Sequence, residues 1–227
     1  MAEAHELNAI SIMTEAPDFM SVRLNLRSNF AFNHLRAAIR AAQSALEVEC
    51  ANDITQHGAW FEDMMMHVPV AVVMASAALD ANCNEIVQDI LDGSPAAQLM
   101  QEANNLKGAR SGKTIERYRT VARLLGKTPQ EGPAWQNAGR LVSFRNAFMH
   151  FKPAWDTETN IHDDVWVMEL RARLPISPGY QSNFMFPYGL MTYGCAKWAV
   201  EAARTFSAEF SLLVGVKDGL AGGEALS

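Results

Sequence analysis

A short polar motif around residue 145 contains the residue types that RNA cleavage without a metal requires. It reads Arg145-Asn146-Ala147-Phe148-Met149-His150. The guanidinium of Arg145 is always charged and can fork onto a phosphate. The imidazole of His150 can move a proton near neutral pH, and Asn146 can hold a ribose or phosphate oxygen. A proton-transfer group beside a fixed cation is what attack of a 2′-hydroxyl on a phosphate needs.

Arg145, Asn146 and His150 resemble the R-x4-6-H motif of HEPN domains, in which Asn often follows the Arg. The resemblance implies an all-α homodimer whose two Arg/His pairs face a shared groove and cleave RNA through the 2′-hydroxyl, without a metal or another cofactor. In that scheme Arg145 stabilises the phosphorane, His150 is the acid/base group and Asn146 orients the site. Glu85 matches the family's acidic position on an earlier helix. Many members belong to toxin–antitoxin or phage-defence systems, which implies an antitoxin or a nucleotidyltransferase as a further partner.

The same residues allow a second interpretation. Some HEPN proteins keep the fold without nuclease activity and act as binding modules. A histidine near the C-terminus of a helix can also make purely structural interactions with the last carbonyls and the helix dipole. The alternative is therefore a non-catalytic, HEPN-like regulatory, scaffold or nucleotide-binding protein.

The motif lies in a basic segment of an otherwise acidic chain. Residues 107–152 contain ten Lys or Arg and two Glu, which gives +8, whereas the net charge of the whole chain is −6. Clustered cations suit a phosphate or RNA ligand, although a basic helix face can equally neutralise acidic helices beside it. The candidate substrate-binding residues are Lys113, Arg117, Arg140 and Lys152 from this segment, together with Glu85.

Apolar residues recur at the helical spacing of three and four over most of the chain. The pattern predicts helices at about 28–53, 59–91, 96–106, 114–125, 134–151 and 188–214. Ser28 is a plausible N-cap of the first helix, and Pro69 could bend the second. The expected fold is an antiparallel bundle of four or five long helices.

The remaining segments are expected to lie outside this bundle. We expect residues 1–27 to form a loosely ordered arm, and residues 215–227 to form a flexible tail. Residues 153–187 are expected to form an irregular insertion in the 28–214 domain, with one possible strand from Val165 to Leu174.

The composition of the chain excludes several further classes of fold and site. The chain has 227 residues, 49% of them apolar, and too few glycines and prolines (14 and 9) for an all-β sandwich. Its three distant cysteines and the spacing of its histidines provide no disulfide framework and no metal site, and the N-terminus lacks the pattern of a signal peptide. The most apolar stretch, residues 64–79, is shorter than a bilayer needs. We therefore expect a cytoplasmic protein.

Overall fold

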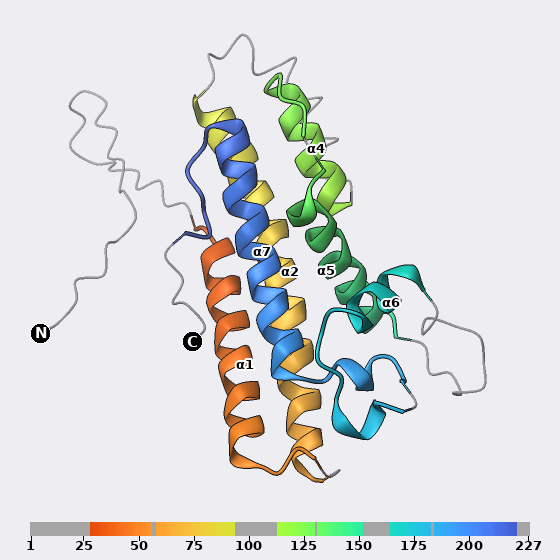
Figure 1. Ribbon diagram of the computed structural model, residues 1–227. Helices are drawn as coiled ribbons and strands as arrows, with labels where there is room; N and C mark the ends of the chain where they lie inside the picture. Colours follow the sequence, from red (N-terminus) through yellow and green to blue (C-terminus); the bar gives the residue numbers. More distant parts are fainter. Residues whose placement is uncertain are drawn as a thin grey trace, which may run out of the picture.

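All regular structure in the described part of the chain is helical (Figure 1), which confirms the all-α prediction. The computed structural model describes residues 28–55, 58–93, 113–129, 131–151, 164–182 and 184–221. The α-helices are α1 (Ala31–Ala51), α2 (Trp60–Gly93), α4 (Thr114–Leu124), α5 (Pro133–Met149), α6 (Val165–Arg171) and α7 (Tyr193–Val214). Two 3₁₀ turns, η2 (Pro178–Tyr180) and η3 (Tyr188–Leu190), lie between α6 and α7. The predicted helix at 96–106 falls outside the described residues.

Helix α2 is the centre of the bundle. It contacts α1, α4, α5 and α7, and it continues through Pro69 without ending. In Figure 1, α1 and α7 run beside α2, while α4 and α5 lie along another side of it. Among the described residues, Trp60–Ile90 is the one helix long and apolar enough to pass for a membrane span, and many of its apolar residues belong to the core of the bundle. The structure does not point to a membrane protein.

Two helix starts are capped by glutamates from distant parts of the chain. The Glu85 carboxylate of α2 accepts hydrogen bonds from the backbone N–H groups of Phe30 (2.7 Å) and Ala31 (2.9 Å), at the start of α1. The N-cap position is Phe30, so the predicted cap at Ser28 is wrong. Glu49 of α1 accepts from the Tyr193 N–H (2.7 Å) at the start of α7, and burial raises its pKa. These carboxylates accept hydrogen bonds from N–H groups that have no acceptor within their own helix. Their negative charge also interacts favourably with the positive end of each helix dipole.

The predicted strand from Val165 to Leu174 is wrong, because this segment forms α6. Val167 and Leu170, three residues apart, point into the core, while Val165 and Met168 are exposed. Trp166 also packs against Phe144 and Phe186. A helical period therefore fits the burial of this segment better than alternation does.

The prediction of a flexible tail from residue 215 is wrong for residues 215–221. Gly215 ends α7 in a left-handed conformation (φ 76°), which glycine adopts without strain. The chain then packs back on the bundle, since Leu220 is 1% exposed and the Asp218 carboxylate accepts from the Ser207 hydroxyl (2.5 Å). The predicted arm at 1–27, residues 153–163 of the insertion and residues 222–227 lie outside the described residues.

We predict that Glu85→Ala lowers the free energy of unfolding by about 1 kcal/mol, because both α1 N–H groups lose a charged acceptor. Glu201→Ala, which removes an exposed glutamate inside α7, is the matched control and should change the stability by less than about 0.5 kcal/mol. Urea unfolding followed by circular dichroism measures both variants. Equal stability of the two variants would contradict a capping role for Glu85.

Candidate functional site

A groove of about 600 Å³ separates α4 from α5, and α2 contributes to its wall; we call it the α4–α5 groove. Its polar lining comes from three helices and the residue before α4. The residues that line it are Asp80, Lys113, Thr114, Ile115, Glu116, Arg117, Gly139, Val142, Ser143, Arg145 and Asn146. It therefore combines three cationic side chains with a concave surface large enough for a small ligand or part of a polymer.

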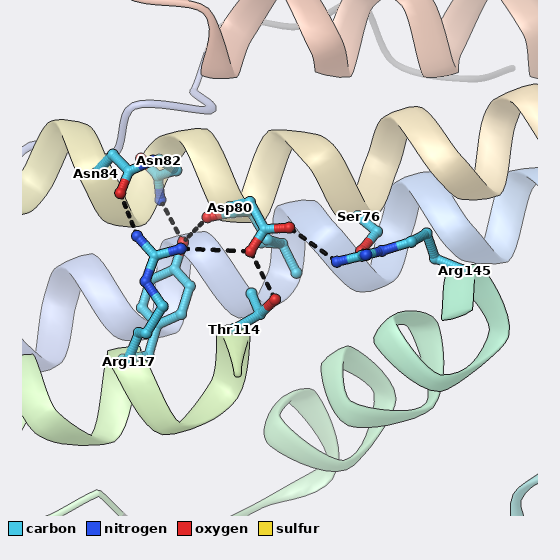
Figure 2. Close-up of polar contacts among 9 residues, drawn as sticks. Ser76, Asp80, Asn82, Asn84, Thr114, Arg117 and Arg145 are labelled. Carbon is cyan, nitrogen blue, oxygen red and sulfur yellow. Dashed lines mark hydrogen bonds and ion pairs between the residues drawn. The ribbon is translucent and has the colours of Figure 1, made fainter. Parts of the chain in front are cut away.

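Asp80 of α2 is the hub of the polar contacts in this groove (Figure 2). One carboxylate oxygen, Oδ2, accepts a hydrogen bond from Arg145 Nη2 at 3.0 Å. The other, Oδ1, accepts from the Thr114 hydroxyl at 2.6 Å and lies 3.5 Å from Arg117 Nη1. The carboxylate thus ties both α4 and α5 to the central helix.

Two contacts hold the Arg145 side chain, and they do not occupy all the donors of its guanidinium. Its Nε donates to the Ser76 hydroxyl at 3.4 Å, and Nη2 donates to Asp80. Among the described residues nothing pairs with Nη1, and 27% of the side chain remains exposed. The guanidinium is therefore oriented in advance and keeps a donor for a ligand in the groove.

Arg117 anchors α4 more deeply. It is 6% exposed and donates to the Asn84 side-chain oxygen in addition to its pairing with Asp80. Behind it the Tyr118 hydroxyl donates to the Leu79 carbonyl (2.8 Å) and accepts from Asn82 Nδ2 (3.1 Å), and burial raises the tyrosine pKa. Burial likewise raises the pKa of the Cys83 thiol to about 11. Neither group is therefore ionised at neutral pH, and Cys83 is a poor nucleophile.

Four of the predicted site residues lie together. Arg145, Asn146, Lys113 and Arg117 all line the α4–α5 groove. Asn146 and Lys113 are exposed, and no described residue forms an ion pair with Lys113. These two side chains are therefore available to a ligand.

Glu85 and Arg140 are not in the groove. Glu85 caps α1, as described above, so the acidic residue that faces Arg145 is Asp80. Arg140 is 8% exposed and uses Nε to donate to Glu169 of α6 (2.5 Å) and Nη1 to donate to Asn137 (3.0 Å). The prediction that these two residues bind substrate is corrected to a structural role for each. Lys152 lies outside the described residues.

His150 does not line the groove either. It is exposed at the C-cap of α5, where its backbone N–H donates to the Asn146 carbonyl at 3.0 Å. Five helical residues place it about 7.5 Å farther along the α5 axis than Arg145 and about 140° around it. The two motif residues therefore point in different directions from the same end of the helix.

Part of the basic segment neutralises acidic side chains, which is one of the two purposes considered for it. Arg117, Arg140 and Arg145 pair with carboxylates of α2 and α6, and Arg119 pairs with Glu116 and with Glu131 (2.7 Å). Much of the charge therefore neutralises acidic neighbours. The charge pattern did not identify Asp80 as part of the site. A carboxylate within an apolar helix is usually paired with cations, so the position of Asp80 was a signal that the sequence did contain.

No protein-family model matches the chain, and neither a curated protein nor a solved structure matches it. The likeness to HEPN domains therefore stays a prediction from the motif. Within the described residues there is also no group of three or more His, Cys, Asp or Glu side chains placed to hold a metal ion. The cations that line the groove, Arg145 among them already oriented, are of the type that binds anions.

We predict that Asp80→Asn lowers the free energy of unfolding by about 1–3 kcal/mol, because it removes the negative charge that faces the buried Arg117 guanidinium. The control is Glu209→Gln, an exposed carboxylate of α7. Urea unfolding at 0.1 M and at about 1 M salt measures both, since the partly buried contacts of Asp80 are screened less than a surface pair. A change within 0.5 kcal/mol for Asp80→Asn would contradict its role as the hub.

Proposed function

We propose that the protein is a metal-independent endoribonuclease of the HEPN type that binds the RNA backbone in the α4–α5 groove. The observation that carries the proposal is the convergence of Arg145, Arg117 and Lys113 on one groove, with Arg145 already oriented by Asp80 and Ser76. A phosphate bound there would accept from Arg145 Nη1 and from the Lys113 ammonium. Asn146 at the rim could hold a ribose hydroxyl.

Cleavage would need His150 as well as the groove. In the proposed reaction the 2′-oxygen attacks the adjacent phosphorus, the bond to the 5′-oxygen breaks, and a 2′,3′-cyclic phosphate and a 5′-hydroxyl result. Arg145 would stabilise the charge on the phosphorane, and His150 would remove the proton from the 2′-hydroxyl or supply one to the leaving oxygen. For both side chains to act on one phosphate, that phosphate would have to lie at the end of the groove beside the last turn of α5, where His150 follows Arg145 by about 7.5 Å along the helix axis.

A binding protein without cleavage is the second candidate. It is favoured by the position of His150 outside the groove lining and by the structural pairing of Arg145 with Asp80. Such a protein would hold RNA or a nucleotide in the same groove, or act as a scaffold for an antitoxin or a nucleotidyltransferase. The nuclease and an RNA- or nucleotide-binding protein both predict ligand binding at Arg145, a scaffold does not, and only the nuclease predicts that His150 matters.

The test is cleavage of a mixed RNA pool in EDTA by the wild type, Arg145→Ala and His150→Ala. We expect cleavage by the wild type and a loss of at least 100-fold in both variants, because each removes a group that acts in the transition state. Arg123→Ala, which removes an exposed α4 cation outside the groove lining, is the matched control and should cleave normally. Circular dichroism and the melting temperature verify that every variant is folded.

A steric variant separates the groove from its charges. A side chain at Gly139 would enter open space, since an added Cβ meets no atom within 4 Å, and Gly139 lines the groove. Gly139→Phe should therefore block RNA while it leaves every cation in place, whereas Gly139→Ala should bind normally. Cleavage unchanged by His150→Ala or by Gly139→Phe would contradict the nuclease, and binding without cleavage by the wild type would establish the second candidate.

A further inference from the structure

A second surface, formed by α1 and α2 away from the α4–α5 groove, has the properties of a protein interface. We define the α1–α2 face by Arg36, Arg40, Glu47, Asp63, Met66 and Val70. Met66 and Val70 are 58% and 47% exposed. Of the most apolar 18-residue stretch of α2, less than half (44%) is buried. Met66 and Val70 lie one turn apart in the first third of α2, and neighbouring exposed apolar side chains of this size suggest that another surface covers them.

The face is also shaped for a helix to approach. A shallow groove of about 400 Å³ follows α1 beside Val70, and its lining includes three small residues, Ala37, Ala41 and Ser44, together with Asn33, Arg36 and Arg40. Small side chains at a helix surface let a second backbone come close. This groove and the α4–α5 groove have no lining residue in common.

The charges on the face are arranged in two halves. Arg36, Arg40 and Glu47 are exposed within about 40° of one another around α1, with the cations in its first half and the carboxylate in its second. Asp63 is exposed near the start of α2, at the end where the short connection joins the two antiparallel helices (Figure 1). One end of the face is therefore basic and the other acidic. Among the described residues, no ion pair involves Arg40, Glu47 or Asp63.

Such a pattern is complementary to itself in only one orientation. A two-fold axis across the face reverses the direction of α1 in the second copy, so that the basic end of each copy lies over the acidic end of the other. If Arg40 faces Glu47 of the second copy, the axis passes close to Ser44, and by symmetry the ion pair occurs twice. Met66 and Val70 then lie near the centre of the contact, where the apolar part of an interface is expected.

We infer that the α1–α2 face is the surface through which two copies of this chain form an antiparallel homodimer. This pairing differs from the shared groove that the resemblance to HEPN domains implies, because neither Arg145 nor His150 is on the face. A dimer formed through the α1–α2 face does not bury the α4–α5 groove of either copy in that contact. The inference does not depend on RNA cleavage, and a failure of either proposal leaves the other standing.

Charge reversal tests the face and its orientation together. The full chain is measured by sedimentation velocity between 1 and 100 µM as wild type, Arg40→Glu, Glu47→Arg and the double variant. We expect a dimer for the wild type, dissociation constants raised at least tenfold in each single variant because like charges then meet twice, and recovery in the double variant. Arg123→Glu, an exposed α4 cation outside the face, should dimerise as the wild type does.

Met66→Asp is the second probe of the same face, since it brings two carboxylates together near the axis. It should produce a monomer with an unchanged melting temperature at low protein concentration, which excludes misfolding. A monomeric wild type at 100 µM overturns the inference. So does a dimer that neither Arg40→Glu nor Met66→Asp weakens, or single variants that weaken it without recovery in the double variant.

Discussion

The structure depends on one carboxylate, Asp80, which lies in the middle of the most apolar helix of the bundle. Its side chain is 33% exposed at the wall of the groove, and the chain supplies its partners from two other helices. Thr114 and Arg117 reach it from α4, and Arg145 reaches it from α5. These contacts, together with the buried apolar residues of α4 and α5, hold the two helices on α2, and the groove lies between them.

The same pairing determines what the groove can do. A free arginine would lose side-chain entropy on binding a phosphate, whereas Arg145 has already been oriented by Asp80 and Ser76. The carboxylate also lowers the net positive charge near the guanidinium, so a ligand has to be recognised by geometry as well as by charge. Lys113 at the start of α4 adds a cation that no described residue neutralises. The groove is thus suited to a phosphate chain that makes several contacts rather than to a single anion.

Much of the fold could be predicted from the sequence, because long amphipathic helices with clear stop signals leave a strong pattern. The ends of α4 and α5 lie close to the predicted ones. Helix α6 was missed because its seven residues are too few for the helical period to stand out against alternation. The long-range cap of Glu85 and the packing of Leu220 were missed because each depends on residues far apart in the chain.

For the candidate site, the sequence could identify the cations but not their partners. Arg145, Asn146, Arg117 and Lys113 were singled out by charge and motif, and they do share a groove. Arg140 belonged to the same basic run, yet it pairs with Glu169, because only tertiary structure decides which cation meets which carboxylate. The motif also suggested that His150 acts beside Arg145. A separation of five residues on one helix, however, directs the two side chains to different sides.

The most direct test of the account is the salt dependence of binding to a fluorescent single-stranded RNA, measured by anisotropy. Each phosphate contact contributes about −0.7 to the slope of log affinity against log salt concentration. The account predicts that Lys113→Ala and Arg145→Ala each reduce the steepness by about one contact, while Arg123→Ala leaves it unchanged. A slope that is the same in all four proteins would contradict the claim that the α4–α5 groove binds the RNA backbone.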